Sequence, residues 1–562
     1  MAMHLIQVTQ QAGAQLIICR PHASSALTSQ SGSNIKQRTT MKSGRIIYIA
    51  CLITLLGVAA CSKNKFDINS NPDDVTDGSV TATVLLPAAQ QETSRLLVAD
   101  FWVLNWWMGY GARSGSYQTR NEEETYQFTN NFKMEIWNDL YRNATNYNLV
   151  INRANEAGEG FFEAVGRIMK SHNFQLLVDI YGNIPYTEAF RGTAASTPKY
   201  DTGIDIYNSI FAELDKAIEI LQDNDAISQA RNPEMRTADL VFRGNATNWI
   251  RFANTLRLRM LVHLLNGTTT TTTAPGIDIN EQIAKITTDG FLNEGQSAHL
   301  NPGFSGTKPN PYYRYYHTNE SGTGAQNDFL RGSEYAISYY DANGDPRLDR
   351  FYVAPASGHR GIRFGTPSGD PTLEGNFLST IRGVGLIPEG AASRAWIMTS
   401  VESLFLQAEA RERGILTTGP SAEELLTRAV TESFVWLGLT QADADEYLLF
   451  NEGYPDVDYH APSIRPGQPG GGIYTILSQK WFALNSIAPY EIWTDYRRTG
   501  ITYGTAVGYV SGPTLSVDPN RTATSIPVRL FYPQSEYNYN AANVNAEGTI
   551  NVFNNRIFWD LN

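Results

Sequence analysis

The stretch TGIDIYNSIFAELDKAIEIL, residues 202–221, indicates most directly which fold the chain adopts. Its large apolar residues recur at spacings of three and four, which gathers them on one face of an α-helix. Thr202 and Asp205 resemble a capping box at the start of that helix. The stretch therefore predicts an amphipathic helix that buries one face, formed by Tyr207, Ile210, Phe211, Leu214, Ala217, Ile218 and Leu221.

The same period recurs along the chain and predicts a protein made mainly of helices. Ser421 with Glu424 three residues later is a capping-box pattern, and the helix it starts runs through Leu425, Ala429 and Phe434. Helical patterns also mark Trp249, Phe252, Leu256, Met260 and Leu264, then Ile397, Val401, Leu404 and Ala408, a start near Leu85, and residues 132–154, 166–181 and 473–496.

Long irregular segments separate these helices. Residues 267–276 contain six consecutive threonines, and residues 301–383 are rich in Gly, Pro, Tyr and Asn without a helical period. Residues 462–472 read as a loop, and residues 500–562 as short strands and turns. The helices pair at spacings close to those of tetratricopeptide repeats. We therefore expect a mostly α fold: a helical-pair, tetratricopeptide-like scaffold with few short strands and a loop-rich insertion at about 267–390, in a single domain over residues 81–562.

Residues 41–61, MKSGRIIYIACLITLLGVAAC, have the pattern of a bacterial lipoprotein signal peptide. Lys42 and Arg45 form a basic start, an apolar run follows, and small residues precede Cys61. A transmembrane helix needs about 18 or more apolar residues, and this run is shorter. The alternative, a buried helix of the folded domain, does not explain the basic flank. We predict that residues 41–60 are removed and that Cys61 receives lipid.

Three expectations follow from this signal. Residues 1–40 form an upstream extension that is either disordered or not translated, and residues 61–80 form a lipidated tether. Of the three cysteines, Cys19, Cys51 and Cys61, only the last remains after cleavage, which excludes a disulfide or a thiolate metal site. The protein would lie on a membrane through its anchor and would not span it.

Composition narrows the function further. The formal net charge of −12 argues against nucleic-acid binding, which needs a basic surface. Aromatic residues make up 11 % of the chain, with 29 Tyr and 10 Trp. Their flat apolar faces suit both a large core and the stacking of sugar rings, so composition leaves both roles open.

Enzyme motifs are absent from the sequence: it has no HExxH, GxSxG or GxxxxGK[ST] pattern. Glu402 and Glu409 share a helix face and could form a glycosidase pair, but the residues around them read as helix packing. We therefore expect a protein that is not an enzyme.

A metal site is also weakly supported. Asp341, Asn343 and Asp345 mimic the start of a calcium loop, which then fails at Pro346 and Tyr352. A turn is the simpler interpretation. We expect no cofactor and no metal site, with a structural calcium ion left open.

Two aromatic clusters are the candidates for ligand binding. One contains Trp102, Trp106, Trp107, Tyr110 and Tyr117, and its spacing also fits a core helix face. The other is PYYRYYH, residues 311–317, where Pro309 and Pro311 disfavour a helix. Asn105, Arg314 and Asn327 could bind sugar hydroxyls beside these rings. The predicted ligand-binding residues are Trp106, Trp107, Tyr110, Tyr312, Tyr313, Tyr315 and Tyr316, with packing as the alternative role.

Four single features carry structural expectations. Gly182 fits a helix C-terminus that needs a positive φ, and His263 fits a satisfied core or surface residue better than a ligand. Arg529 lies between apolar residues, so we expect it to pair with a carboxylate. Residues 122–124, three glutamates, read as a solvated turn.

Five segments together resemble one protein family. They are DIYGNIPYTEAFRGTAASTPKYDTGIDIY (residues 179–207), DLVFRGNATNWIRFANTLRLRM (239–260), VESLFLQAEA (401–410), EIWTDYRRTG (491–500) and IPVRLFYPQSEYNYNAANV (526–544). With the lipid cysteine, they resemble the SusD/RagB-like outer-membrane lipoproteins of Bacteroidetes, in particular the SusD-like branch. The resemblance covers essentially the whole mature chain.

This resemblance implies a function. A helical repeat face would dock on a SusC-like TonB-dependent transporter, and a ligand site would lie on the opposite, loop-rich side. The ligands of the family are oligosaccharides, or peptides in some members. We thus expect a lipid-anchored outer-membrane protein, at the cell surface, that binds an oligosaccharide and delivers it to the transporter. The alternatives are a lipid-anchored glycan-degrading enzyme, a peptide-binding member of the family, and a structural helical-repeat assembly factor.

Overall fold

The computed structural model describes residues 80–119, 121–265, 276–318, 328–462, 471–500 and 515–561. All of them belong to one compact unit, Val75–Asn562. The upstream extension, the signal peptide, Cys61 and most of the tether lie outside the described residues, so these four calls stay predictions. Within the described ranges, none of the helices combines the length and the hydropathy that crossing a bilayer requires.

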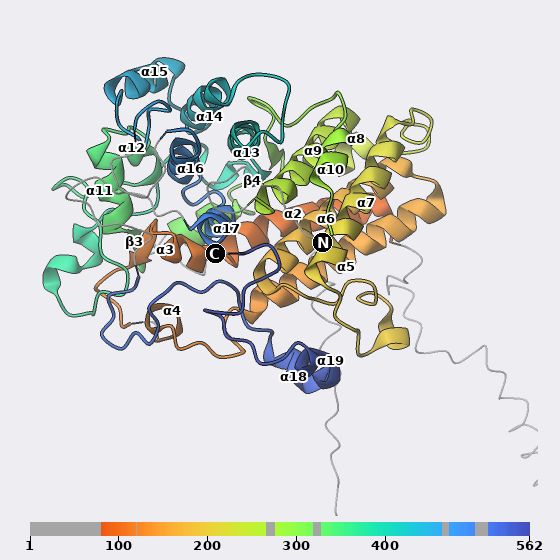
Figure 1. The fold of residues 1–562 in the computed structure, drawn as a ribbon, viewed down its shortest axis with the longest axis horizontal. Helices are drawn as coiled ribbons and strands as arrows, with labels where there is room; N and C mark the ends of the chain where they lie inside the picture. Colours follow the sequence, from red (N-terminus) through yellow and green to blue (C-terminus); the bar gives the residue numbers. More distant parts are fainter. Residues whose placement is uncertain are drawn as a thin grey trace, which may run out of the picture. The chain divides into compact units, whose positions relative to one another are not determined.

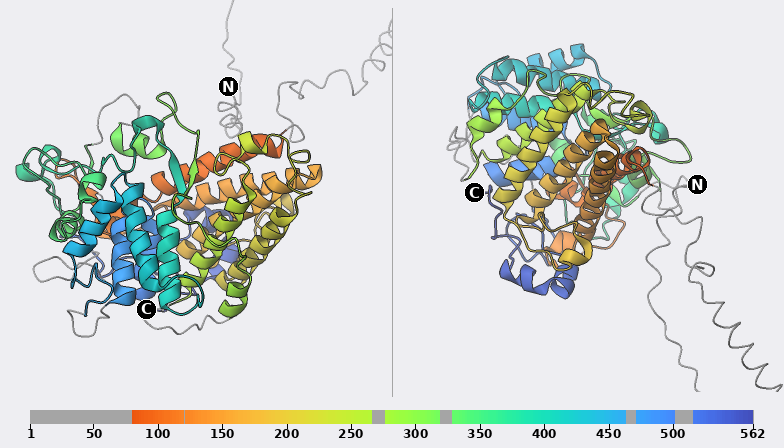
Figure 2. Two further views of the ribbon diagram at one scale, coloured as in Figure 1. Left: turned by 90° about the horizontal axis from the view of Figure 1, so that it is seen from above. Right: turned by 90° about the vertical axis from the view of Figure 1, so that its right-hand side faces the viewer.

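Long antiparallel helices form the scaffold (Figure 1). Successive helices pack on one another in the first half, and a second group packs in the C-terminal half. The left view of Figure 2 shows the two groups side by side, and α9 joins them by packing on α13. The first group is α2 (Ala82–Ala99), α5 (Met134–Ala157), α6 (Gly160–Tyr181), α7 (Gly203–Gln222) and α9 (Ala246–His263); the second is α13 (Ser400–Glu412), α14 (Ala422–Trp436), α16 (Gly472–Ala483) and α17 (Pro489–Thr499).

Shorter elements fill the connections, so the expected mostly α fold with few strands is confirmed. The short helices are α3 (Trp102–Trp107), α4 (Asn121–Thr125), α8 (Met235–Ala238), α10 (Ile279–Ala284), α11 (Glu334–Ala342), α12 (Leu348–Phe351), α15 (Gln441–Phe450), α18 (Gln534–Tyr539) and α19 (Ala541–Ala546). Single helical turns are η2 (Gly192–Ala195), η3 (Tyr313–His317), η4 (Pro371–Leu373), η5 (Gly375–Phe377) and η6 (Gly390–Ala392).

The helix starts follow from local side chains. The Thr202 hydroxyl accepts a hydrogen bond from the Asp205 backbone N–H and caps α7, whose buried face contains every residue that the periodicity predicted. At α14, Ser421 and Glu424 satisfy each other's backbone N–H groups in a complete capping box. These two local predictions are confirmed.

Two predicted helix boundaries are wrong. Ile397 lies in strand β4 (Ala395–Met398), because Thr399 caps α13 and starts that helix only after the strand. The single helix expected at residues 473–496 is two helices, α16 and α17. Pro489 occupies the first turn of α17, where its missing N–H is tolerated, and the chain turns between the two helices.

Two segments expected to be irregular or strand-like contain helices. In the insertion, Ser333 caps α11, and α12 follows a few residues later. The described residues at the C-terminus, 515–561, form α18 and α19 and contain no strand. The sequence does not show a helical period in either segment, because these helices are only 4 to 9 residues long, too short for a repeating apolar face.

The strands form two small antiparallel pairs. β1 (Gly111–Arg113) pairs with β3 (Leu330–Gly332), with Ala112 opposite Arg331. β2 (Ala298–Leu300) pairs with β4. The first pair matters for function, because it brings the loop-rich insertion beside the aromatic segment that follows α3.

A buried network of charges crosslinks helices of the second group. Arg498 of α17 binds Glu409 of α13 at 2.7 Å, and Lys480 of α16 binds Glu491 of α17 at 2.8 Å. Burial raises the pKa of Glu409, but Arg498 and Arg413 outweigh it and lower that pKa to about 2. These side chains are fully buried, so each charge depends on its partner.

The four single-residue expectations have mixed outcomes. Gly182 has φ +78°, and His263 is fully buried between two carboxylates, as expected. Arg529 donates to the carbonyl oxygen of Tyr181 and contacts no carboxylate among the described residues. The turn at residues 122–124 is helix α4, and Glu124 is buried against Arg113 at 3.1 Å, because that guanidinium needs a partner inside the fold.

Candidate ligand-binding site

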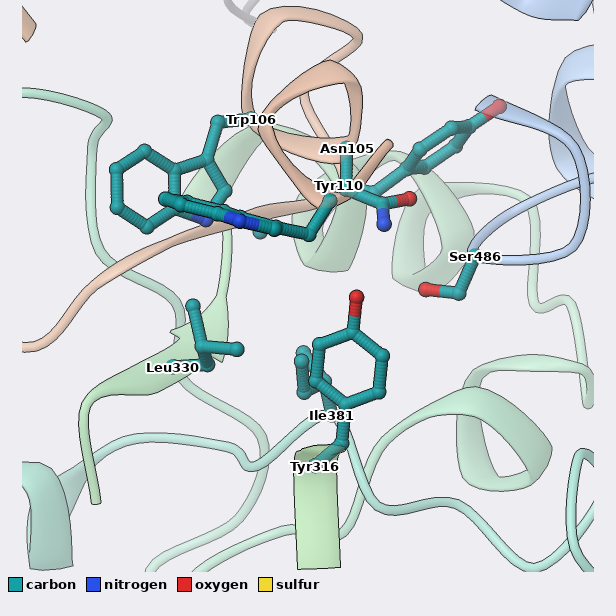
Figure 3. A pocket seen from close by; sticks show the side chains of 9 residues that line it. Asn105, Trp106, Tyr110, Tyr316, Leu330, Ile381 and Ser486 are labelled. Atoms are coloured by element: carbon teal, nitrogen blue, oxygen red, sulfur yellow. The ribbon is translucent and has the colours of Figure 1, made fainter. Parts of the chain in front are cut away.

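The two predicted aromatic clusters, about 200 residues apart in sequence, meet around one pocket. α3 supplies one wall, and η3 supplies the opposite one. Figure 3 shows the Tyr316 hydroxyl pointing into the space between Trp106, Asn105 and Ser486. The lining residues are Trp102, Asn105, Trp106, Tyr110, Gly111, Tyr316, Leu330, Ile381 and Ser486.

The pocket is small. Its volume of about 10 Å³ holds roughly one water molecule, whereas pockets that enclose a ligand measure about 300–1,000 Å³. A sugar therefore cannot be enclosed here. The buried rings of Trp106, Tyr110 and Tyr316 instead form an aromatic floor. Partly exposed rings lie next to this floor.

Ring contacts hold the α3 side of the pocket. Trp102 meets Trp106 edge-on with ring centroids 4.6 Å apart, and Trp106 in turn contacts Phe329 at 5.8 Å. The Lys133 ammonium lies 4.1 Å from the centre of the Trp102 ring, a cation–π contact. Tyr110 stacks on Trp481 and donates to its carbonyl oxygen at 2.7 Å. These contacts fix the rings before any ligand arrives.

The η3 side has an unexpected helical turn. Pro311 was expected to prevent a helix, yet the chain is helical from that residue. Proline is tolerated in a first turn, where its missing N–H needs no partner. The Asn310 side-chain oxygen accepts from the backbone N–H groups of Tyr312 and Tyr313 and starts the turn. Tyr312 and Tyr316, four residues apart, then lie on one face with centroids 4.4 Å apart.

The structure divides the seven predicted ligand residues into three groups. Trp106, Tyr110 and Tyr316 line the pocket but are almost fully buried. Trp107 and Tyr312 lie in the core. Tyr313 and Tyr315 face outward, the former half-buried and the latter 42 % exposed.

The two core residues have partners within the fold. Trp107 packs against Phe128, Phe132 and Trp493. The Tyr312 hydroxyl donates to the Ile381 carbonyl oxygen at 2.8 Å. We infer a supporting role for both residues.

Polar groups at the pocket are few. The Asn105 side-chain oxygen has no hydrogen-bond partner among the described residues, and the amide points into the pocket. Arg314 is exposed on η3, and Asn327 lies outside the described residues. Burial and the Arg382 charge lower the pKa of His317 to about 4, so His317 is neutral at pH 7.

Three lining residues, Leu330, Ile381 and Ser486, were missed by sequence reasoning. They lie in three separate segments that only the tertiary fold brings to α3. None belongs to a motif, and a single apolar or basic residue in a loop carries no signal of its own. The pairing of β1 with β3 would have pointed to Leu330, but strands of three residues are too short to recognise.

The proposed carboxylate pair is part of the core. Glu402 binds Arg259 at 2.9 Å, and both side chains are buried. Glu409 binds Arg498 and Arg413, each at 2.7 Å. With their oxygens committed to guanidinium groups inside the scaffold, these two carboxylates serve packing, as the sequence around them suggested.

The segment that mimics a calcium loop is a helix end. α11 stops at Ala342, Asn343 donates to the Tyr339 carbonyl, and Gly344 follows with φ +55°. Asp345 binds Arg347 at 2.7 Å in the core. Across the part of the chain that the structure describes, no group of three or more His, Cys, Asp or Glu residues could hold a metal ion.

Comparison with known proteins gives the family. Residues 72–533 match the SusD-like family described as "Starch-binding associating with outer membrane". No curated protein matches the sequence.

Solved structures show the same fold. A chitin-binding SusD homologue from Flavobacterium johnsoniae is 21 % identical with TM-score 0.63, covering 85 % of this chain and 98 % of its own. A SusD-like protein from Bacteroides thetaiotaomicron is 22 % identical with TM-score 0.65, covering 86 % and 99 %. A SusD homologue from Bacteroides fragilis is 17 % identical with TM-score 0.65, covering 85 % and 100 %. The chain therefore belongs to the SusD-like family of outer-membrane-associated binding proteins, a family that is not catalytic.

Proposed function

We propose that this SusD-like protein captures an oligosaccharide at the cell surface and delivers it to a SusC-like TonB-dependent transporter. Membership of a family described as starch-binding and associated with the outer membrane supports the capture step. A relative of the same fold is described as chitin-binding, so glycan binding occurs on this scaffold. The lipoprotein signal in residues 41–61 supports attachment to the membrane.

One observation carries the proposal: two distant aromatic clusters converge on one floor, with partly exposed rings at its edge. Tyr315 is 42 % exposed beside buried Tyr316, at a centroid distance of 6.4 Å. Trp102 is partly exposed, and Trp106 and Lys133 fix its ring. Rigid, half-exposed rings of this kind stack on the apolar faces of sugars.

Calorimetry with the mature protein tests the capture step. The ligands are malto-, chito- and acidic oligosaccharides, and the variants are Trp102→Ala and Tyr315→Ala. Each variant should weaken binding roughly tenfold, because a stacked ring contributes about 1–1.5 kcal/mol. Tyr539→Ala is the matched control: that side chain is 79 % exposed on α18, away from the pocket. No binding of any glycan, or equal losses in all three variants, would contradict the proposal.

The delivery step needs a separate experiment. The native lipoprotein is isolated from membranes in mild detergent, and copurifying proteins are identified by mass spectrometry. A TonB-dependent barrel present in stoichiometric amount is the expected result. Its absence, together with intact glycan binding, would leave a surface binding protein without a transport role.

A further inference from the structure

Arg382 is the chain neighbour of a residue that lines the aromatic pocket. It directly follows Ile381, which lines the pocket and whose carbonyl oxygen accepts a hydrogen bond from Tyr312. Its guanidinium is close enough to lower the pKa of His317, the neighbour of Tyr316. The side chain is half-buried. Across the described ranges, its guanidinium has neither a hydrogen-bond partner nor an ion-pair partner.

The charges around Arg382 do not balance it. Burial and the nearby Arg331 charge lower its pKa, and Asp328 opposes them. Arg331 already binds that carboxylate at 3.1 Å and donates to the Gly375 carbonyl at 2.7 Å. Asp328 is itself 63 % exposed. Two guanidinium groups therefore share one carboxylate, and His317 is neutral at pH 7, so among the residues that the structure describes the positive charge of Arg382 is not fully compensated.

Such an arrangement is unfavourable for the unliganded protein. A half-buried cation beside a like charge loses solvation and gains repulsion. Buried Arg498 and Arg347 have carboxylate partners, and buried Arg529 donates to a backbone carbonyl. A bound anion would supply the ion-pair partner that the Arg382 guanidinium lacks.

We propose that the captured ligand is an acidic oligosaccharide whose carboxylate or sulfate group binds Arg382 while its sugar rings stack on Trp102 and Tyr315. This inference rests on the proposed glycan capture. A guanidinium fork matches the planar oxygens of a carboxylate, or two oxygens of a sulfate, with two parallel hydrogen bonds. Because the whole chain carries a net charge of −12, an acidic ligand needs a local positive site of this kind to be held.

Matched ligand pairs test the charge preference. The first pair is an oligogalacturonide and its methyl ester, and the second is a sulfated oligosaccharide and its desulfated form. Where a pair of ligands binds, the acidic member should bind at least about tenfold more tightly than the neutral member, because hydrogen bonds between charged groups are strong. The preference should shrink as salt rises from 0.05 to 0.5 M, since salt screens a partly exposed pair. Equal affinities within both pairs would overturn the inference.

Arg382→Gln should abolish the preference for the acidic member, and Arg382→Lys should keep part of it as a point charge. The matched control is Arg428→Gln on α14, whose guanidinium binds Glu294 at 2.5 Å outside the pocket and should leave affinity unchanged. The thermal unfolding temperature of Arg382→Gln should not fall below that of the wild type, because the change relieves the repulsion between Arg382 and Arg331. This separates lost recognition from lost folding.

The outcomes distinguish the two proposals. Binding of neutral glycans only, or an unchanged preference in Arg382→Gln, overturns the acidic ligand but leaves glycan capture standing. Absence of binding to every glycan overturns both. Binding of the carboxylate pair but not the sulfate pair, or the reverse, supports the inference and identifies which anion the site accepts.

Discussion

The Nε2 atom of His263 lies 3.0 Å from a carboxylate oxygen of Glu491, and both side chains are fully buried. On the other side of the ring, Nδ1 lies 3.0 Å from Asp179. Other polar groups surround His263 and its two carboxylate partners, and they come from several elements. They are Tyr207 on α7, Arg259 on α9, Lys480 on α16, Arg497 on α17 and, at the C-terminus, Trp559. Burial lowers the pKa of His263, but Glu491 and Asp179 outweigh it and raise that pKa above 6.5.

The first prediction concerns alkaline pH. Because the pKa of His263 is higher in the folded than in the unfolded protein, its protonation stabilises the fold below about pH 6.5. That stabilisation is lost as pH rises through the folded pKa. His263→Gln should therefore lower the free energy of unfolding most at pH 6, with a smaller difference at pH 9. Urea unfolding at several pH values measures this.

The control for this series is His460→Gln, in which the replaced side chain is 70 % exposed. It should leave the pH dependence of stability unchanged. A constant difference between wild type and His263→Gln from pH 6 to pH 9 would contradict the linkage.

The second prediction concerns Glu409 and acidic pH. Its two guanidinium partners lower its pKa to about 2, so the ionised carboxylate stabilises the fold above about pH 4.3. This contribution is lost as pH falls towards 2. At pH 7, Glu409→Ala should reduce the free energy of unfolding by about 3–5 kcal/mol, because it leaves Arg413 and Arg498 with uncompensated buried charge.

A surface pair gives the comparison for Glu409. Lys216 and Glu219 lie 3.2 Å apart but are mostly exposed. Lys216→Ala should change stability little, since exposed ion pairs contribute little. Comparable losses in Glu409→Ala and Lys216→Ala would contradict the importance of the buried network.

Local sequence signals predicted the scaffold well because long helices repeat their apolar face several times. Thr202 and Ser421, for example, mark helix starts that the structure reproduces. The sequence did not predict the short elements. The strand that contains Ile397 and the helix α11 each contain too few residues to show a period. The meeting of Trp106 with Tyr316 and Ile381 depends on tertiary folding. Sequence reasoning found the aromatic residues but could not decide which of them face outward.

The third prediction concerns membrane attachment. Cys61→Ala should prevent lipidation and release the protein from the membrane fraction. Metabolic labelling with a fatty acid and detergent phase partitioning measure the change. Cys51→Ala is the control, because that residue lies within the segment that is removed. An unlabelled wild-type protein would contradict the lipoprotein signal.

The fourth prediction separates core aromatic residues from ligand-facing ones. Trp107 is fully buried and packs against three other aromatic rings. Trp107→Ala should reduce the free energy of unfolding by about 3–5 kcal/mol, because it removes apolar contacts and leaves a cavity.

Tyr315 is the counterpart, since its exposed ring contributes little to packing. Tyr315→Ala should leave the urea midpoint nearly unchanged while weakening glycan binding about tenfold. Calorimetry at a temperature where both variants remain folded keeps the two effects apart. If Tyr315→Ala loses stability but not affinity, then the outward rings of η3 belong to the packing of the insertion, and the ligand must bind elsewhere on this face.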